Sequence, residues 1–341
     1  MRAAVIDKPN EIHVGDVPDP EPKSGEVVVQ VGACGICGSD LNIAAGLFPP
    51  SPFPLVPGHE FAGMVVAIGA DVDWLAVGDR VAVDPSLYCG HCEWCAIGRG
   101  NLCDNWGAIG DTVDGACAEF VAVPAVNCYR LPDHLSYQQG ALVEPLSCAV
   151  HALDILRPRV AESALVVGAG TMGLLTAQLI ALSGTTTVAV TDRNAARLPL
   201  AAELGATLVD TDVAAVIDAT GGFDMVVDAS GSPGAMRAAL DGVRKGGRFM
   251  VVGVAPPEAV LAVSPFRIYN QELTILGSMA VLDSYSRALQ LIAAGTVYVD
   301  PLLTHSVSIE GYPNALETVR RGEGVKVQIV PDDSSRNDTP S

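Results

Sequence analysis

The feature that most constrains the fold is a run at 163–191 that contains no charged residue. A run this apolar resembles a membrane span, but glycines divide it into segments that are too short to cross a bilayer. Short apolar strands are predicted at 164–167 and 187–191, and glycines cluster at 168–173 between them. The helix predicted over 172–182 rises only about 16 Å, well short of the roughly 30 Å of a bilayer core. The run therefore predicts a strand–helix–strand unit that is buried on both faces.

The glycines of this unit are spaced as Gly168-Ala-Gly170-Thr-Met-Gly173, directly after the first strand. Gly168 permits a tight turn, Gly170 lets the backbone approach a pyrophosphate, and Gly173 lets the helix pack on the strand. The helix N-terminus adds amide donors and a positive dipole for phosphates. Asp192 follows at the end of the second strand, where it can bind two ribose hydroxyls. We interpret the unit as a dinucleotide site; the alternative is a glycine-rich turn in an ordinary α/β protein.

Strands and helices continue to alternate after this unit. Further strands are predicted at 223–228, 248–253 and 273–278, with a Ser-Pro pair opening the helix between the first two. One helix is expected to start late or to bend, because Pro199 falls inside it. The alternation predicts a doubly wound parallel sheet in an α/β fold.

The first 130 residues have a different pattern. Their apolar runs are short, rich in β-branched residues and bounded by turn residues, which is typical of antiparallel strands. We expect a partly open β-barrel that carries long loops. The runs lie at 26–31, 63–68, 80–83 and 119–123.

A helix predicted over 136–156, interrupted at Pro145, bridges the two regions. Beyond the parallel sheet, helices at 283–294 and 312–321 and a strand at 325–330 are expected to return to the first region. We therefore divide the chain into a catalytic domain, a cofactor domain and a returning segment. The boundaries are 1–148, 149–280 and 281–341.

Two short motifs in the barrel region, Cys-Gly-Ser-Asp at 37–40 and Gly-His-Glu at 58–60, carry metal-binding side chains. The thiolate of Cys37, the imidazole of His59 and the carboxylate of Glu60 could close on one point. Soft sulfur, nitrogen and oxygen together suit Zn²⁺ better than Mg²⁺ or Ca²⁺, and few protein ligands leave a position open for substrate. The alternative is a buried cysteine and a core histidine that never meet.

Four more cysteines follow within fifteen residues, with two, two and seven residues between them. Four thiolates can wrap one tetrahedral zinc ion, so we expect a closed structural site in a lobe at 89–103. The alternatives are two disulfides or an iron–sulfur cluster. The start of the chain lacks the apolar core of a secretion signal, and the Cys-Pro of cluster-type spacing is absent. The four are Cys89, Cys92, Cys95 and Cys103.

Composition excludes some partners. The formal net charge of −19 and the pI near 4.5 argue against nucleic acid or an anionic membrane as partner, because an acidic protein repels polyphosphate. A length of 341 residues suits two domains. We expect a cytoplasmic enzyme with a small-molecule substrate.

In combination these motifs resemble the zinc-dependent medium-chain dehydrogenases, and within them the polyol, or sorbitol dehydrogenase, branch. The resemblance runs from Gly35-Ile36-Cys37-Gly38-Ser39-Asp40 and Gly58-His59-Glu60 through the cysteine lobe to the dinucleotide fold. It implies a GroES-like barrel domain joined to a Rossmann domain, with two zinc ions per chain. The catalytic zinc is implied to bind Cys37, His59 and a third ligand from 144–147, where the polyol branch has glutamate, here Glu144, and ordinary alcohol dehydrogenases have cysteine.

Glu60 is the rival for the third ligand position, and the resemblance leaves open which of Glu60 and Glu144 binds the metal directly. Asp40 is implied as the acceptor that orients His59. In the implied reaction the metal acts as a Lewis acid on a hydroxyl, Ser39 accepts the hydroxyl proton, and a hydride passes to a nicotinamide. The active site is therefore expected in the cleft between the domains.

We predict NAD rather than NADP as the cofactor, because the carboxylate of Asp192 sits where the 2′-phosphate of NADP would go. Arg193 is the counterargument, since an arginine there can pair with that phosphate, but Arg193 is free to swing into solvent. The residues that we assign to the NAD site are Gly168, Gly170, Thr171, Met172, Gly173, Asp192, Arg193, Arg197, Ser230, Val252, Gly253, Val254, Ser278 and Met279.

The sequence departs from the family pattern at two places. Many alcohol dehydrogenases place a histidine where Asn42 stands, so the proton must leave through ribose hydroxyls and water. Sorbitol dehydrogenases have an arginine that contacts the polyol after the last strand of the cofactor domain, and 277–280 has none. The particular substrate therefore stays open.

Other functions remain as alternatives: an L-threonine or simple secondary-alcohol dehydrogenase on the same fold, or a non-catalytic NAD-binding protein. The last is the weakest, because Cys37, His59, Glu144 and Ser39 are all present. We also expect a homodimer or homotetramer, since the apolar strand at 273–277 falls at the edge of the sheet, and exposed edges are usually covered.

Overall fold

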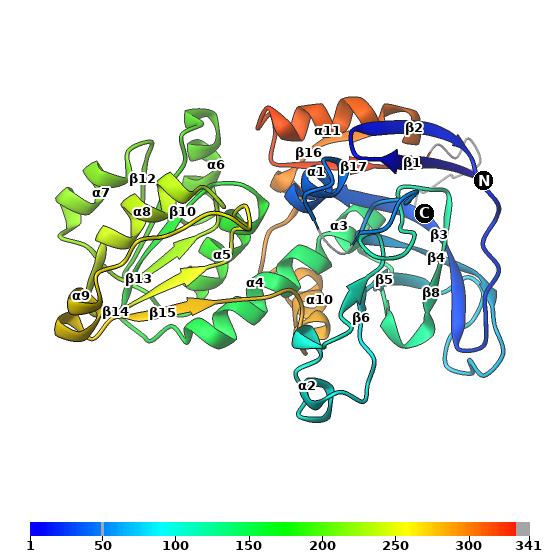
Figure 1. The fold of residues 1–341 in the computed structure, drawn as a ribbon, viewed down its shortest axis with the longest axis horizontal. Coiled ribbons are helices and arrows are strands. Elements are labelled where there is room, and N and C mark those ends of the chain that lie inside the picture. The colour runs from blue at the N-terminus through cyan, green and yellow to red at the C-terminus, as the bar shows by residue number, and fades with distance from the viewer. Residues whose placement is uncertain (49–50, 332–341) are drawn as a thin grey trace.

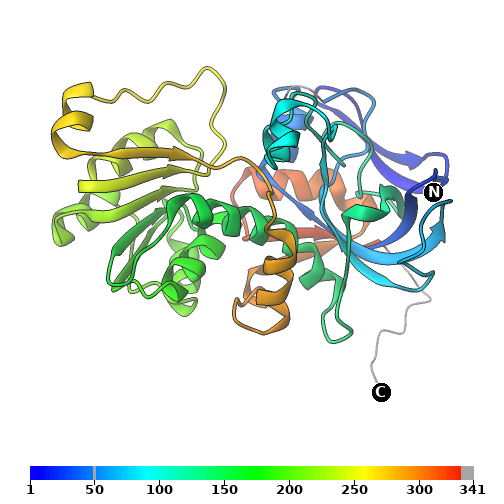
Figure 2. The same ribbon diagram turned by 90° about the horizontal axis from the view of Figure 1, so that it is seen from below.

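The computed structural model describes residues 1–48 and 51–331. The described chain forms two halves that lie side by side, one built on a parallel sheet and the other on a larger, mainly antiparallel sheet (Figure 1). Helix α4 (Val143–Leu156) runs between them, and the same two halves are separate when the molecule is seen from below (Figure 2). This agrees with the α/β fold class expected from the sequence.

The predicted doubly wound sheet is present. It has six strands, and each neighbouring pair is parallel. The strand order reverses between β10 and β13, and such a reversal opens a crevice at the carboxyl ends of the strands. The order is β12 (Leu208–Asp210), β11 (Thr187–Thr191), β10 (Ser163–Val167), β13 (Phe223–Asp228), β14 (Val243–Val251) and β15 (Thr274–Gly277).

Helices cover both faces of this sheet. All five residues of β10 are buried, which explains the charge-free run seen in the sequence. The helix that contains Pro199 starts late, as predicted, because Pro199 is its second residue and a proline is tolerated in the first turn. The helices are α5 (Thr171–Leu182), α6 (Leu198–Glu203), α7 (Val213–Thr220), α8 (Pro233–Asp241) and α9 (Pro265–Gln271).

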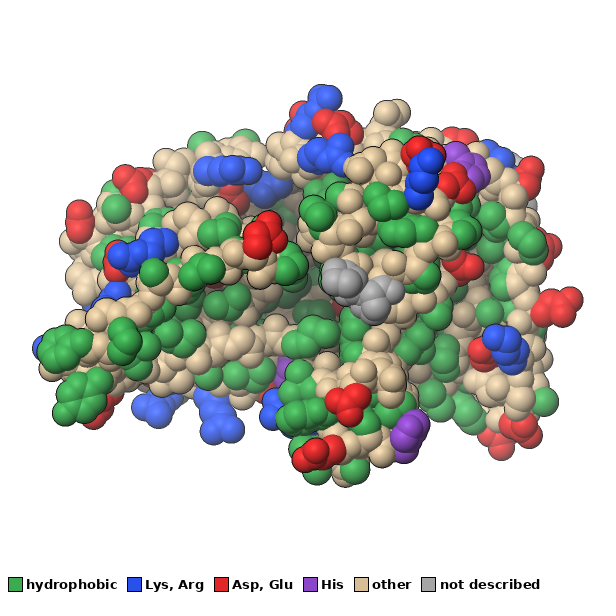
Figure 3. All heavy atoms as spheres, in the orientation of Figure 1, with side chains coloured by type: hydrophobic (Ala, Val, Ile, Leu, Met, Phe, Trp, Pro, Cys, Tyr) green, Lys and Arg blue, Asp and Glu red, His purple; other side chains and the backbone are tan. Residues whose placement is uncertain are grey.

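Strand β15 is the last strand of the sheet, and most of its residues are exposed. Ile275 is 41% exposed, and on neighbouring α9 Phe266 and Tyr269 are 70% and 81% exposed. Hydrophobic side chains gather at this end of the molecule, where α9 lies (Figure 3). The edge position of this strand was expected; the association that we predicted from it stays a prediction.

The other half is the predicted barrel-like sheet. Seven strands take part, and every pair except β16–β17 is antiparallel. The last strand of the described chain pairs with β3, with Val327 opposite Ile36, so the C-terminal segment returns to this half. The order is β16 (Leu303–Val307), β17 (Lys326–Ile329), β3 (Glu26–Ile36), β4 (Glu60–Ile68), β5 (Arg80–Val83) and β9 (Cys128–Arg130), with β8 (Phe120–Pro124) also paired to β3.

The remaining elements surround this sheet. A hairpin and four helices pack around it, and a small lobe projects from it. They are β1 (Arg2–Lys8), β2 (Glu11–Asp16), α1 (Gly38–Ala44), α3 (Tyr137–Ala141), α10 (Tyr285–Ala293) and α11 (Tyr312–Arg320), and in the lobe β6 (Ser86–Leu87), α2 (Glu93–Ala96) and β7 (Gly107–Ala108).

The predicted interruption at Pro145 is wrong. The break lies at Leu142, between α3 and α4, and Pro145 is the third residue of α4. A proline is compatible with that position, because the first amides of a helix have no partner within it. Glu144 is thereby carried on the first turn of the helix between the two halves.

The two largest clusters of buried apolar side chains are one inside the barrel and one that continues from the barrel through α4 and α5 into the parallel sheet. This shared core fixes the two halves against each other. Within the described ranges, no helix is both long and apolar enough to cross a bilayer. The domain limits at 148 and 280 stay a prediction.

Candidate active site and cofactor crevice

Three predicted metal-binding side chains converge where β3 and β4 meet. Cys37 follows the end of β3, and His59 comes immediately before Glu60, the first residue of β4. Gly35 pairs with Glu60 across these strands, so their register brings the two motifs together. Cys37, His59 and Glu60 each offer one donor atom, and these atoms lie within 4.8 Å of one another. We call these three residues the mixed-donor cluster.

Asp40 does not have the position expected for it. Its Oδ2 accepts a hydrogen bond of 2.7 Å from the backbone N–H of Cys37, which caps the start of α1. Its Oδ1 lies 3.8 Å from His59 Nδ1, whereas Oδ1 of Asp111 lies 3.1 Å from that nitrogen. The prediction that Asp40 orients His59 therefore needs a correction: Asp111 is the nearer carboxylate, because Asp40 is turned toward the helix N-terminus.

The imidazole of His59 is buried between acidic groups and a hydroxyl. Its Nδ1 faces the two carboxylates, and its Nε2 lies 3.3 Å from Ser39 Oγ. Burial disfavours the charged imidazole, but Asp111 and Asp40 outweigh burial and raise the pKa of His59 well above its ordinary value. Since the carboxylates occupy the Nδ1 side, Nε2 is the nitrogen left to bind a metal, and Ser39 borders that position.

Glu60 has a cationic partner that the sequence analysis missed. Lys326 Nζ lies 2.8 and 2.5 Å from the two carboxylate oxygens of Glu60, and both side chains are almost fully buried. Lys326 also donates to the carbonyl of Ile36 at 3.1 Å. The available signal was a lysine in a strand with apolar neighbours on both sides, Val325 and Val327, since a buried lysine requires a partner.

Glu144 lies near the mixed-donor cluster but outside the group whose donor atoms are within 4.8 Å. The thiol of Cys148, one turn later on α4, donates to Glu144 Oε1 at 3.4 Å. Burial raises the pKa of Glu144 to about 7; the neighbouring Glu60 also raises it and His59 lowers it. In the described part of the chain Glu144 has no ion-pair partner, so its charge is the less compensated of the two carboxylates.

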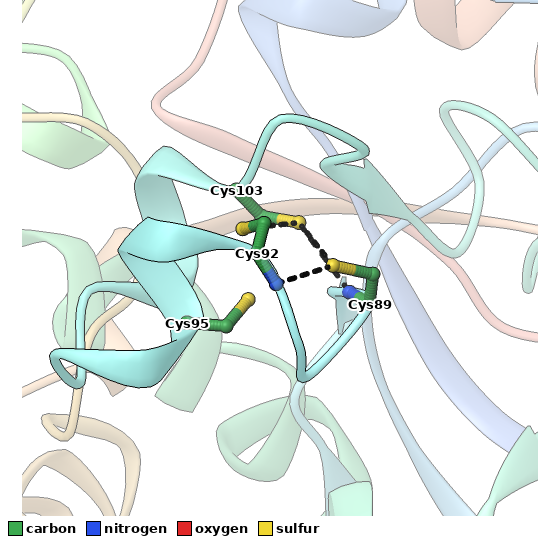
Figure 4. Close-up of side chains that lie close together, drawn as sticks. All are labelled: Cys89, Cys92, Cys95 and Cys103. Carbon is green, nitrogen blue, oxygen red and sulfur yellow. Dashed lines mark hydrogen bonds between the residues drawn. The ribbon is translucent and has the colours of Figure 1, made fainter.

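The four cysteines of the lobe come together as predicted, with their thiols turned toward one another (Figure 4). Cys103 Sγ lies 3.5 Å from Cys89 Sγ and 3.8 Å from Cys92 Sγ. Backbone amides of Cys89 and Asn105 donate to Cys103 Sγ at 3.3 Å, which suits a thiolate. A hydrogen bond from the backbone of His91 lowers the pKa of Cys89 to about 6.

Both groups fit metal ions. Thiolates bound at about 2.3 Å to a tetrahedral zinc are about 3.8 Å apart, whereas a disulfide would need about 2.05 Å. The sulfur separations in the lobe match the first value, and its cysteines are free thiols. The mixed-donor cluster offers sulfur, nitrogen and oxygen, which is the donor set of an open zinc site.

The glycine motif forms the predicted turn between β10 and α5. Gly168 has φ +107°, a conformation that favours glycine, and a Cβ on Gly173 would lie 1.7 Å from the carbonyl oxygen of Gly168. Asp192 Oδ2 accepts a hydrogen bond of 2.7 Å from the backbone N–H of Ala169, and its Oδ1 accepts one of 2.8 Å from Asn194. Asp192 thus holds the turn at the mouth of the crevice.

A cavity of about 320 Å³ lies in this crevice. Six of the residues assigned to the NAD site line it, and the sequence analysis missed Thr211 and Val213, because no strand was predicted at β12. The six are Gly168, Gly170, Asp192, Arg193, Arg197 and Ser230.

The other residues assigned to the NAD site do not line this cavity. Thr171, Met172 and Gly173 form the first turn of α5. The remainder follow β14 and β15 at the same carboxyl edge of the sheet, where Gly253 N–H bonds the carbonyl of Asp228 and Ser278 N–H that of Val251. They are Val252, Gly253, Val254, Ser278 and Met279.

One short segment joins the crevice to the mixed-donor cluster. Arg197 donates to the carbonyls of Gly322 and Gly324 at 2.9 and 2.7 Å, and Thr171 Oγ1 donates to the carbonyl of Val325 at 3.0 Å. The next residue, Lys326, is the partner of Glu60. The two sites therefore share a wall, and the surface is hollowed where the two halves meet (Figure 3).

Family models match both halves of the chain. Residues 23–133 match the alcohol dehydrogenase GroES-like domain, and residues 171–294 match the zinc-binding dehydrogenase domain. Together with the two cysteine-containing clusters, these matches define a zinc-binding oxidoreductase.

Sequence comparison with named dehydrogenases narrows the class of oxidoreductase to which the chain belongs. The chain is 33% identical to D-arabinitol dehydrogenase 1 of Uromyces fabae and 33% identical to sorbitol dehydrogenase of Bacillus subtilis. Each of these matches covers 97% of this chain and 97% of the relative. It is 32% identical to L-threonine 3-dehydrogenase of Pectobacterium atrosepticum, over the whole of this chain and 97% of the relative. The chain therefore belongs to the zinc-dependent alcohol dehydrogenase family, and its relatives include the polyol branch that its motifs resemble.

Solved structures of dehydrogenases have the same fold as this chain, in agreement with the family assignment. A zinc-binding dehydrogenase of Sinorhizobium meliloti bound to NADP superposes with a TM-score of 0.92 at 35% identity, covering 97% of this chain and 99% of that one. An alcohol dehydrogenase of E. coli CFT073 complexed with NADH superposes with a TM-score of 0.90 at 30% identity, with the same coverage.

Proposed function

We propose that this protein is an NAD-dependent zinc dehydrogenase that moves a hydride between a secondary hydroxyl of a polyol and the nicotinamide. The observation that carries the proposal is the wall shared by the two sites: Val325 contacts the first turn of α5, and adjacent Lys326 pairs with Glu60. A substrate bound at the mixed-donor cluster thereby lies next to a dinucleotide bound in the crevice. That adjacency is what hydride transfer requires.

The mixed-donor cluster and Glu144 would hold the catalytic zinc, and the four-cysteine lobe a structural one. When bound at the open site, Zn²⁺ supplies a Lewis acid that favours ionisation of a substrate hydroxyl. Ser39, whose Oγ lies 3.3 Å from His59 Nε2, accepts the hydroxyl proton. Asp111 keeps the imidazole of His59 oriented, and Lys326 keeps the carboxylate of Glu60 in place.

NAD is the proposed cofactor because Asp192 borders the crevice with a carboxylate that accepts two backbone hydrogen bonds. That charge would repel the 2′-phosphate of NADP. Arg197, the nearest arginine to Asp192 at 3.7 Å, is already bonded to two carbonyls of the facing loop. Because of these hydrogen bonds, the guanidinium of Arg197 is not available to pair with the 2′-phosphate of NADP.

A polyol substrate is favoured by Glu144, which stands where ordinary alcohol dehydrogenases have cysteine, and by the arabinitol and sorbitol dehydrogenases among the relatives. The second candidate substrate is L-threonine, because L-threonine 3-dehydrogenases of similar identity are also among them.

The test is the absorbance of NADH formed from NAD with a panel of sugar alcohols, cyclitols, diols and L-threonine. We expect the highest kcat/KM with a sugar alcohol or cyclitol. A clear preference for L-threonine would replace the polyol assignment with the second candidate. No NADH with any member of the panel would count against both.

A further inference from the structure

A buried side chain of the cysteine lobe, Asn101, contacts the segment that follows β15. This residue lies two positions before Cys103 and is 3% exposed. Its Nδ2 donates to the backbone carbonyl of Met279 at 2.9 Å and lies 3.4 Å from Nε2 of His151 on α4. A single amide therefore joins the lobe, the helix that carries Glu144 and the segment that follows β15.

That segment has an unusual backbone. Ala280 and Asp283 have φ values of +48° and +49°, in the left-handed region that side chains other than glycine rarely adopt. Such a conformation persists only where surrounding contacts hold it. The amide of Asn101 bonds the carbonyl directly before Ala280, so it is placed to hold this turn.

The same segment lies at the carboxyl edge of the parallel sheet. The backbone N–H of Ser278 donates a hydrogen bond to the carbonyl of Val251 at the end of β14. Val254, three residues after Val251, packs against the loop after β13: a Cβ added to Gly231 of that loop would lie 2.5 Å from the carbonyl oxygen of Val254. The cofactor crevice opens at this edge. Ser278 and Met279 do not line the cavity beside Asp192, but we assign both to the NAD site, so a shift of residues 278–280 would move that part of the assigned site.

We propose that Asn101 is a positioning residue of the cofactor site: through its bond to Met279 the cysteine lobe fixes residues 278–280 for dinucleotide binding. This inference rests on the proposed function and deepens it, because it assigns to the lobe an effect on cofactor affinity in addition to stability. A purely structural role would affect only folding.

Asn101→Asp separates the two roles. The substitution keeps the shape of the side chain but removes the NH₂ donor and turns an acceptor toward the carbonyl of Met279. Asn270→Asp is the matched control, because it makes the same change at an exposed residue of α9, outside both the lobe and the segment after β15. Both variants are compared with the unmodified protein for zinc content, thermal midpoint, the Kd of NADH by fluorescence titration, and hydrogen exchange of the peptide 278–284.

We expect Asn101→Asp to weaken NADH binding about tenfold, the effect of losing roughly one hydrogen bond, and to speed exchange at 278–284. Zinc in the lobe should stay at the level of the unmodified protein, and Asn270→Asp should change neither the Kd of NADH nor the exchange at 278–284. Unchanged NADH affinity in Asn101→Asp, or faster exchange spread over the whole chain, would overturn the inference alone. Failure of the unmodified protein to bind NADH would overturn the proposed function and this inference with it.

Discussion

Lys326 forms a buried ion pair with Glu60 of the mixed-donor cluster, with the ammonium nitrogen 2.8 and 2.5 Å from the two carboxylate oxygens. The side chains are 3% and 1% exposed, so water screens the pair little. The negative charge of Glu60 is thus compensated by the protein itself. Among the described residues, the carboxylate of Glu144 has no ion-pair partner; it accepts a hydrogen bond from the thiol of Cys148.

Removing Lys326 should be costly for both stability and activity. Lys326→Met leaves the Glu60 carboxylate buried without a partner, and breaking a buried pair in this way costs about 3–5 kcal/mol. We expect that loss in urea unfolding of protein whose mixed-donor cluster is free of zinc, where no metal replaces Lys326 as the partner of Glu60, together with at least about a tenfold lower kcat/KM in the zinc-loaded enzyme. Lys326→Arg should retain most of both, and Lys245→Met, at an exposed lysine, should change neither. Equal stability of the Lys326→Met and Lys245→Met variants would contradict the importance of this pair.

Ser39→Ala should lower kcat without loss of metal, because the hydroxyl handles only a proton. Glu60→Ala and Glu144→Ala should also lower kcat, but with weaker zinc retention. Metal analysis beside steady-state kinetics distinguishes the two patterns. If Ser39→Ala leaves kcat unchanged, Ser39 is not in the proton path.

Asp111→Asn should weaken zinc binding at the mixed-donor cluster about 10- to 100-fold, the range found when a partner of a metal-bound histidine is lost. Asp40→Asn is the matched variant, since an asparagine can still accept the Cys37 amide. Its effect should be smaller, because Asp40 lies 3.8 Å from His59 Nδ1 and Asp111 3.1 Å. Zinc retention against a graded series of chelators measures both. The reverse order would restore Asp40 as the residue that orients His59.

The unmodified enzyme should prefer NAD to NADP by about a hundredfold or more in kcat/KM, because two anions a few Å apart repel by some kcal/mol. Asp192→Ser should weaken NAD and admit NADP, and adding Arg193→Ala should abolish that gain. Comparable kcat/KM for both cofactors in the unmodified enzyme would show that Asp192 does not set the choice.

Features formed by residues that are close together in the sequence could be predicted from the sequence. The glycine turn, the four cysteines and the pair of motifs around Cys37 and His59 each combine a specific residue type with a specific spacing. The strand register then brings Cys37 to Glu60, since Gly35 pairs with Glu60. The fold class followed from the same local patterns of strand, turn and helix.

Long-range partners were not predictable in this way. Lys326 pairs with Glu60 across 266 positions of the chain, and only the pairing of β17 with β3 brings them together. Asp111 reaches His59 from a loop with no regular pattern. Asp40 was assigned to His59 by family resemblance, but its own helix N-terminus competes for the carboxylate.

The most direct test of the proposed chemistry follows zinc content and activity together while the protein is dialysed against a chelator. We predict that the mixed-donor cluster loses its zinc first and that the rate of NADH formation falls in proportion, while the thermal midpoint falls only when the four-cysteine lobe is emptied. Cys37→Ser and Cys95→Ser, each of which disables one site, assign the two phases. Activity that survives complete loss of zinc from the site of Cys37 and His59 would contradict the account.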